Sequence, residues 1–286
     1  MAVRYLLAAL GASFGVSVAG PASADCNGAP APCEIASGTY DIRLPETSAD
    51  APVVMFLHGY GGDGMVTMNK PQLVDPLLAR GYAVIAPDGL PRGGDGPNSW
   101  AFRPRDGARD ETAFLTDVAR DAARRFGVSD TKVILAGFSA GAFMVSYLAC
   151  KAPQSFAAYA PVSGGFWHPY PDHCDGPVRL FQTHGWADSV VPLEGRPLGN
   201  GTYRQGDIWA GMEIWRAANA CPDDDPSGIS TTGDFMRRQW SDCAPGSDLE
   251  FALFPGGHVV PAGWADMILD WYEAEDGSQA ALIPPE

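Results

Sequence analysis

The sequence predicts an α/β fold with a mostly parallel sheet and helices on both of its faces. Short runs of apolar, β-branched residues alternate with longer segments of helical pattern, and this alternation is typical of sheets built from strand–helix–strand units. The run at residues 52–57 is apolar throughout, as strands buried on both faces are. Glycine, serine, histidine and aspartate collect just after the predicted strands, at the edge where such sheets bind ligands.

The predicted elements follow one another in regular order. Residues 38–44 alternate in character and are expected at the edge of the sheet. The helix at 110–125 carries acidic residues in its first turn and arginines in its last, which matches the helix dipole. Strands are expected at 38–44, 52–57, 82–86, 132–136, 156–162, 178–183 and 249–254, helices at 70–80, 110–125, 140–149, 207–218 and 264–273, a loop rich in glycine, proline and arginine at 90–109, and a polar excursion at 221–243.

Composition indicates a globular protein and argues against one class of partner. Of the 286 residues, 46% are hydrophobic and 19% charged, which is sufficient for one large core. The formal net charge is −15 and the basic residues form no cluster, so nucleic acid is not expected as a partner. An acidic surface of this kind favours neutral over polyanionic substrates.

The first 24 residues have the pattern of a signal peptide. Arg4 supplies a positive charge, residues 5–19 are apolar or small, and Ala22-Ser23-Ala24 forms a cleavage site of the A-x-A type. We therefore expect export to the periplasm or the extracellular space, with residues 25–286 as a single domain. An uncleaved membrane anchor is the alternative, but the apolar run is too short for a stable span, and no stable membrane association is expected.

The six cysteines predict three structural disulfides, because an exported chain meets an oxidising environment. Fifteen pairings are possible, and proximity in the sequence favours Cys26–Cys33, Cys150–Cys174 and Cys221–Cys243. A zinc site is the alternative, but the spacing of cysteine and histidine gives it no support. We expect neither a metal nor another cofactor.

The segment Gly137-Phe138-Ser139-Ala140-Gly141 has the form of a nucleophile elbow. A predicted strand precedes it and a predicted helix follows it, and such a turn would hold the Ser139 hydroxyl above the sheet, with the two glycines leaving room for the backbone. The alternative is an ordinary glycine-rich turn with a surface serine. In this context the pattern favours a nucleophilic Ser139.

A serine nucleophile needs a histidine base, and the base needs a carboxylate to orient it. In α/β-hydrolases the chain order is serine, acid, histidine. Of the five histidines, His258 alone follows a late predicted strand, and Asp188 lies just beyond the strand at 178–183. We predict His258 as the base and Asp188 as the acid; a surface-loop histidine and a turn aspartate are the alternatives.

Acyl transfer also needs hydrogen-bond donors for the developing oxyanion. One is expected to be the Ala140 N–H, directly after the nucleophile. The other is expected from the glycine-rich loop after residues 52–57, with the Tyr60 N–H preferred over that of Gly61. His58, in the same loop, is interpreted as structural.

Aromatic residues in the strand-end loops are candidates for a substrate pocket. They are Trp100, Trp167, Tyr170 and Trp186, with Trp186 preferred because it lies two residues before Asp188. Anchoring of the loops is the alternative role for each.

These motifs make the chain similar to the secreted serine esterases that group polyhydroxybutyrate depolymerases with feruloyl and acetylxylan esterases. The resemblance covers nearly all of residues 25–286. It is carried by His58-Gly59-Tyr60-Gly61-Gly62, the elbow at 137–141, the segment AAYAPVSG at 157–164, His184-Gly185-Trp186-Ala187-Asp188 and Gly256-Gly257-His258, together with Cys150 and Cys221. The chain departs from the family's habit at Trp186-Ala187 and at Val259-Val260-Pro261, and both segments lie near the expected pocket.

The resemblance implies an α/β-hydrolase fold and a secreted serine esterase that needs no cofactor, with Ser139, His258 and Asp188 as its catalytic residues. The expected substrates are small-molecule, oligomeric or polymeric esters, first of all short hydroxyalkanoate esters or polyester. Feruloyl or acetylxylan esters are the alternative. A peptidase, and a non-catalytic binding protein on the same fold, are remoter ones.

Overall fold

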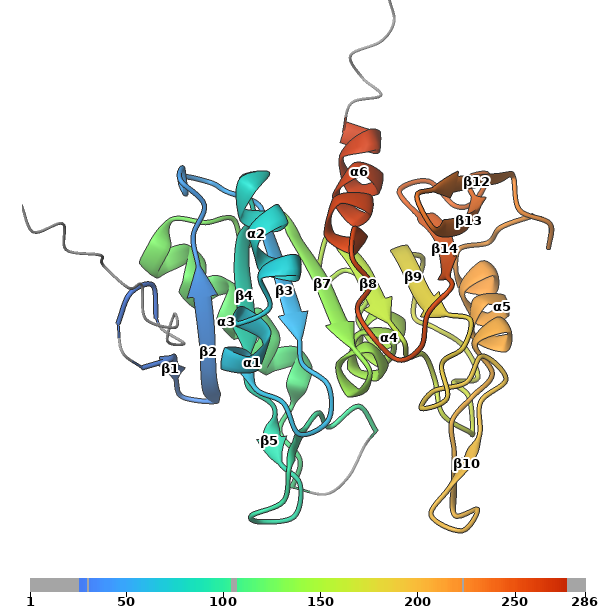
Figure 1. Cartoon of the computed structure of the whole chain (residues 1–286), viewed down its shortest axis with the longest axis horizontal. Helices are drawn as coiled ribbons and strands as arrows, with labels where there is room; N and C mark the ends of the chain where they lie inside the picture. Colours follow the sequence, from blue (N-terminus) through green and yellow to red (C-terminus); the bar gives the residue numbers. More distant parts are fainter. Residues whose placement is uncertain (1–25, 30, 104–106, 223, 277–286) are drawn as a thin grey trace, which may run out of the picture.

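The structure, a computed structural model, describes residues 26–29, 31–103, 107–222 and 224–276. Within these ranges it contains a ten-stranded β-sheet with helices on both faces (Figure 1). The strand order is β1-β2-β4-β3-β7-β8-β9-β14-β13-β12. These strands are β1 (Cys33–Ile35), β2 (Gly38–Arg43), β3 (Val53–Leu57), β4 (Ala83–Pro87), β7 (Val133–Phe138), β8 (Ala158–Val162), β9 (Arg179–Gly185), β12 (Gly228–Thr232), β13 (Phe235–Trp240) and β14 (Asp248–Phe254). The predicted signal peptide at 1–24 lies outside the described residues.

The middle of the sheet is parallel and its margins are antiparallel. Strands β4, β3, β7, β8, β9 and β14 pair in parallel, whereas the two strands at each margin pair antiparallel. The central strands β3, β4 and β8 are buried along their whole length, because helices cover them on both sides. The predicted fold class is confirmed, and the carboxyl ends of the parallel strands lie together at the lower edge in Figure 1.

The helices divide between two hydrophobic layers. Leu115, Leu148 and Trp215 belong to one buried cluster, which packs beneath α3 (Glu111–Phe126), α4 (Ala140–Lys151) and α5 (Ile208–Ala218). Leu77 and Leu269 belong to the other, beneath α1 (Gly64–Met68), α2 (Pro71–Ala79) and α6 (Trp264–Asp276). We call these two sides of the sheet the α4 face and the α6 face.

The segment predicted as a polar excursion, residues 221–243, instead contains the hairpin β12–β13, which extends the sheet beyond β14. The hairpin is polar because it forms the margin, and only its residues that turn inward, such as Phe235 and Trp240, are buried. The short helix α1 was not predicted either. Its Asp63 N-cap accepts a hydrogen bond from the Val66 N–H. This capping aspartate is a local signal for a helix start, but a helix of five residues is too short to show a clear periodic pattern.

Two irregular lobes extend from the carboxyl edge of the sheet (Figure 1). The β5–β6 lobe comprises residues 90–103, with the short strands β5 (Leu90–Pro91) and β6 (Asn98–Ser99). The β10–β11 lobe comprises residues 195–205, with β10 (Pro197–Leu198) and β11 (Tyr203–Arg204). Residues 90–109 were predicted as loop, and the described part of that segment is irregular apart from this hairpin.

Three disulfides join the cysteines in the predicted pairs. They are Cys26–Cys33, Cys150–Cys174 and Cys221–Cys243, and the prediction is confirmed. The second ties the end of α4 to the segment between β8 and β9, and the third closes the base of the β12–β13 hairpin. None of the helices in the described ranges is long and apolar enough to cross a membrane.

Candidate active site

Ser139 occupies a strained turn between β7 and α4. Its backbone has φ 56° and ψ −113°, a conformation that residues with a side chain rarely adopt. A Cβ on Gly141 would lie 2.3 Å from the Leu57 carbonyl oxygen, so only glycine lets α4 approach β3 this closely. The predicted geometry of a nucleophile elbow is therefore present, with the serine side chain at the carboxyl edge of the sheet.

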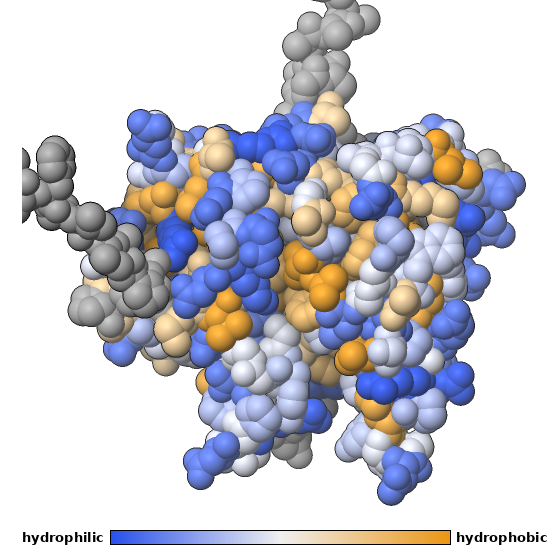
Figure 2. Space-filling model, viewed as in Figure 1, coloured by the Kyte–Doolittle hydropathy of each residue, from blue (hydrophilic) through white to orange (hydrophobic). Residues whose placement is uncertain are grey.

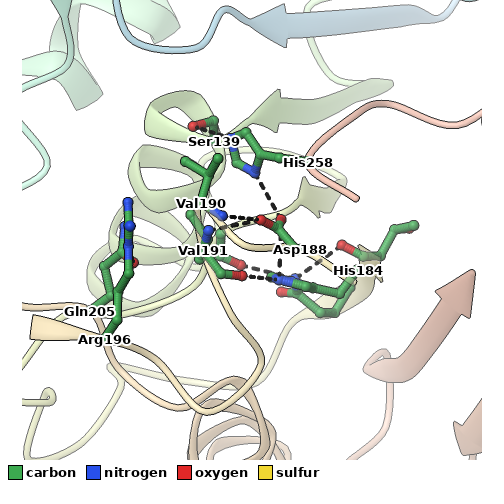
Figure 3. A network of polar contacts seen from close by, with 11 residues as sticks. Ser139, His184, Asp188, Val190, Val191, Arg196, Gln205 and His258 are labelled. Carbon is green, nitrogen blue, oxygen red and sulfur yellow. Dashed lines mark hydrogen bonds and ion pairs between the residues drawn. The ribbon is translucent and has the colours of Figure 1, made fainter. Parts of the chain in front are cut away.

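A continuous chain of hydrogen bonds connects Ser139, His258 and Asp188 (Figure 3). The distance from Ser139 Oγ to His258 Nε2 is 2.9 Å, and that from His258 Nδ1 to Asp188 Oδ2 is 2.8 Å. An ionised carboxylate only accepts hydrogen bonds, so the imidazole proton lies on Nδ1 and leaves Nε2 free to accept from the serine hydroxyl. The structure thus brings together the three residues that the sequence predicted from separate strand ends.

Asp188 is held by backbone donors as well as by His258. Its Oδ1 accepts from the N–H groups of Val190, at 2.9 Å, and Val191, at 2.8 Å. Burial acts to raise the pKa of Asp188, but the hydrogen bonds from His258 and Val191 outweigh it and hold the pKa below its usual value. The carboxylate is therefore ionised at neutral pH and can stabilise a protonated His258.

His184 lies directly beneath this carboxylate, and sequence analysis gave it no role. Its Nε2–H donates to the Val191 carbonyl oxygen at 2.8 Å and lies 3.6 Å from Asp188 Oδ2. Its Nδ1 is buried and has no hydrogen-bond partner among the described residues, and burial lowers the pKa of the ring. A neutral His184 therefore fixes the turn that presents Asp188. Its position four residues before the acid was the available signal.

The oxyanion donors can be judged by which backbone N–H groups are already engaged. The Gly61 N–H donates to the Asn98 carbonyl oxygen at 2.8 Å, which removes it as a candidate. Among the described residues, the N–H groups of Tyr60 and Ala140 have no such acceptor. The loop also passes close to the nucleophile, since a Cβ on Gly59 would lie 3.4 Å from Ser139 Cβ. Tyr60 and Ala140 therefore stay the preferred donors.

His58 braces this loop instead of acting on a substrate. Its Nδ1–H donates to the Gly59 carbonyl oxygen at 2.7 Å, and its Nε2 accepts from the Gly89 N–H at 2.9 Å. Burial lowers the pKa of the ring. Both nitrogens of a neutral imidazole are engaged, so His58 is unsuited to act as a second base, in agreement with the interpretation from the sequence.

A cavity of about 450 Å³ lies between the two lobes, which Figure 2 shows as separate projections of the surface. Ser139, His258 and Asp188 are not among the described residues that line it. It brings together two of the predicted aromatic residues, Trp100 and Trp167. Trp186 does not line it and is 55% exposed. Tyr170 does not line it either, because its hydroxyl anchors the loop before α5 by accepting from the Asp207 N–H at 2.7 Å. The cavity is lined by Arg92, Trp100, Ala101, Phe102, Arg103, Trp167, Leu198 and Tyr203.

Trp100 also anchors a loop, which was the alternative role considered for the aromatic residues. Its indole N–H donates to the His58 carbonyl oxygen at 2.8 Å, and the residue is buried. It therefore anchors the glycine-rich loop while one side of it closes the cavity. Among the described residues, no group of three histidine, cysteine, aspartate or glutamate side chains is placed to hold a metal ion.

With this fold and this site, comparison with known proteins assigns the chain to a family. Residues 52–247 match the family described as the alpha/beta hydrolase fold, and the chain belongs to it. Over 147 residues the chain is 25% identical to the bifunctional acetylxylan esterase/xylanase XynS20E of Neocallimastix patriciarum, a match that covers 50% of this chain and 20% of that protein. Over 155 residues it is 30% identical to NocK of Nocardia uniformis subsp. tsuyamanensis, covering 53% of this chain and 43% of NocK. The matches thus span less than half of either relative.

Solved structures agree on the fold. An acetyl xylan esterase from Aspergillus awamori superposes with a TM-score of 0.59 at 16% identity, covering 82% of this chain and 93% of that one. The carboxylesterase of Bacillus cereus superposes with a TM-score of 0.55 at 14% identity, covering 84% and 95%. At these identities the likeness concerns the fold alone.

Proposed function

We propose that this protein is a serine esterase that hydrolyses carboxylic esters through an acyl-enzyme on Ser139. The observation that carries the proposal is the unbroken hydrogen-bond chain Ser139–His258–Asp188, which ends on a nucleophile held in a strained turn. Membership of the alpha/beta hydrolase family supports it, because this fold presents such a triad at the same edge of the sheet.

In the first half of the reaction, Ser139 Oγ attacks the ester carbonyl carbon and its proton passes to His258 Nε2. The bond from this carbon to the alcohol oxygen then breaks, and His258 returns the proton to the leaving alkoxide. The products are acyl-Ser139 and the free alcohol. Asp188 stays ionised and stabilises the imidazolium that exists between the two proton transfers.

In the second half, water replaces the alcohol. His258 removes a proton from the water as its oxygen attacks the acyl carbon, and the proton then returns to Ser139 Oγ as the acyl bond breaks. The carbonyl oxygen carries negative charge in both halves, and the free N–H groups of Tyr60 and Ala140 stabilise it there. A well-placed donor of this kind contributes roughly 3–4 kcal/mol to the transition state.

The protein acts, in this proposal, as one exported domain. Three disulfides support an oxidising compartment, and residues 1–24 have the pattern of a signal peptide.

The first substrate class proposed is short hydroxyalkanoate esters or polyester, on the resemblance of the motifs to polyhydroxybutyrate depolymerases. Esters of aromatic acids, as in feruloyl carbohydrates, are the second. They are favoured by the ring-lined cavity, in whose wall the rings of Phe102 and Trp167 lie 5.8 Å apart; the buried Phe143 packs behind them, 5.6 Å from Trp167. The name of XynS20E adds acetylated xylan to the esters worth assaying.

One parallel assay tests the proposal. Purified mature protein and its Ser139→Ala variant are incubated with a 3-hydroxybutyrate oligomer, a feruloyl-arabinose ester and an aryl acetate. We expect hydrolysis that the variant loses by at least on the order of 10⁴-fold. Preference for the oligomer or for the feruloyl ester decides between the two substrate classes. An active Ser139→Ala variant contradicts the mechanism, and inactivity of both proteins on all three esters favours a non-catalytic binding protein.

A further inference from the structure

The cavity between the lobes lies on the α4 face of the sheet. Trp100, which forms part of its wall, belongs to the core on the α4 face. Phe143, in the first turn of α4, contacts the wall residues Phe102 and Trp167, with ring centroids 5.5 and 5.6 Å apart. The Phe143 N–H donates to the Ser139 carbonyl oxygen. Phe143 thus connects the wall of the cavity to the turn that carries Ser139.

His258, by contrast, lies toward the α6 face of the sheet. Its ring packs at 4.6 Å from that of Phe138, and both Phe138 and the neighbouring Val260 pack against the core of the α6 face. Because His258 must reach the leaving alkoxide to protonate it, the alcohol part of an ester lies toward the α6 face. The acyl part then extends in the opposite direction, toward the cavity.

The charged and buried polar groups that line the cavity are donors, and these donors have no acceptor among the described residues. Arg92 and Arg103 line it, and neither guanidinium takes part in an ion pair with a carboxylate of the described residues. The indole N–H of Trp167 is buried and likewise has no acceptor among the described residues. An indole N–H and a guanidinium can only donate, so their acceptors come from water or from a bound ligand.

This cavity also differs in charge from the others in the described residues. Each of four further cavities is lined by at least one aspartate, as expected for a chain with 34 acidic and 19 basic residues. No described residue that lines the cavity between the lobes is acidic. The charged groups that line this cavity are therefore positive, although the net charge of the chain is negative. Charges further away are screened by solvent and salt.

We infer that the cavity binds an acyl group with a flat apolar body and a carboxylate at the end away from the ester bond. The enzyme then prefers monoesters of dicarboxylic acids over the corresponding neutral esters. The rings of Phe102, Trp167 and Tyr203 contact the body, and the two arginines pair with the carboxylate. This inference rests on the proposed esterase function, since it assigns the acyl side of that same site.

The test compares matched pairs of esters that differ only in charge. Ethyl 4-carboxybenzoate is compared with ethyl 4-carbamoylbenzoate, and the corresponding cinnamates provide a longer reach. Each ratio of kcat/KM, anionic over neutral, is divided by the ratio of the alkaline hydrolysis rates to remove intrinsic reactivity. We expect a corrected ratio of about ten- to hundredfold for at least one pair, which corresponds to a charge-assisted hydrogen bond.

Three variants identify the groups responsible. Arg92→Gln and Arg103→Gln should lower the ratio about tenfold in combination, chiefly through a higher KM for the anionic ester. Arg120→Gln on α3 changes the net charge equally, but its guanidinium is exposed and pairs with Asp117, so it is the matched control.

A corrected ratio at or below one for both pairs overturns the inference, as does a ratio that the two cavity variants leave unaltered. Failure of the esterase proposal is seen separately, as hydrolysis that persists in Ser139→Ala.

Discussion

The two sides of Ser139 are built in different ways. On the α6 face, His258 and Asp188 are connected by buried hydrogen bonds in which every acceptor of the carboxylate is engaged. On the α4 face, the cavity presents donors that have no acceptor among the described residues, namely Arg92 and Arg103 of the β5–β6 lobe and Trp167. The Asp188 carboxylate is hydrogen-bonded within the protein, whereas the donors of the cavity are available to a ligand. The proposed chemistry is therefore set by the sheet and its strand ends, and the choice of substrate by the lobes.

The comparison implies that the two sides can be altered separately. A change in the triad should slow the hydrolysis of all esters alike, and a change in the lobes should alter the order of preference among them. Each prediction below tests one side against the other.

The largest effect is expected for Asp188→Asn. The amide can still accept from Val190 and Val191, but its NH₂ group would donate to His258 Nδ1. The imidazole proton would then lie on Nε2, which could no longer accept from Ser139. We expect kcat to fall about 10⁴-fold, as for the corresponding change in a serine protease, with the ratio between charged and neutral esters unaltered. Steady-state kinetics on both esters measure this, and a loss below tenfold contradicts the role of Asp188.

Gly141→Ala tests how rigidly the elbow is built. The new Cβ would meet the carbonyl oxygens of Leu57 at 2.3 Å and His58 at 2.8 Å, and backbone atoms cannot move aside as a flexible side chain can. We expect the free energy of unfolding to fall by about 3 kcal/mol or more, measured by urea denaturation.

The control for this variant is Gly211→Ala in helix α5. Its Cβ would make only an ordinary contact, 3.8 Å from the Phe166 ring, and alanine favours the helix by about 0.5–1 kcal/mol. Equal stability of the two variants would mean that the elbow yields and that its strain does not hold Ser139 in place.

Sequence analysis predicted those residues correctly whose type is required at their position by a single physical cause. Glycine before and after Ser139 is required by close backbone contact, and Asp188 and His258 each follow a strand whose carboxyl end must face the nucleophile. The same reasoning predicted the parallel sheet. The nearest-neighbour disulfides followed from proximity in the chain.

Other features depend on tertiary contacts that no local pattern encodes. The β12–β13 hairpin is polar because it lies at the margin, and polarity alone was interpreted as loop. Arg92 and Arg103 lie in an irregular lobe, where their convergence on Trp167 depends on how the chain folds back. His184 belongs to one of the motifs that carry the family resemblance. Its hydrogen bond to Val191 could not be predicted, because it depends on the conformation of the turn between the two residues.

The buried histidines make the triad side sensitive to acid. The folded-state pKa values of His58 and His184 lie below the ordinary 6.5, so below pH 6.5 the unfolded chain binds protons that the native protein does not. The free energy of unfolding should therefore decrease as the pH falls below about 6.5 toward the folded-state pKa values, by at most about 1.4 kcal/mol per pH unit for each histidine.

The His184→Gln variant separates this contribution from others. Glutamine can still donate to the Val191 carbonyl oxygen but does not titrate, so the slope of stability against pH should decrease, by at most about 1.4 kcal/mol per pH unit. Urea denaturation between pH 7.5 and 5 measures both slopes. An unchanged slope would show that His184 is protonated in the native protein.

The smallest effect is expected for Trp186→Ala, although Trp186 was the aromatic residue preferred from the sequence. Its side chain is 55% exposed and lies outside the cavity, so truncation should cost less than about 0.5 kcal/mol of stability and change kcat/KM for small esters by less than about threefold. Trp167→Ala is the counterpart within the cavity. Because it removes ring contacts with Phe102 and Phe143, kcat/KM for aromatic esters should fall about tenfold. The reverse order of the two effects would place substrate recognition beside Asp188, on the triad side, and would remove the division between the two sides of Ser139.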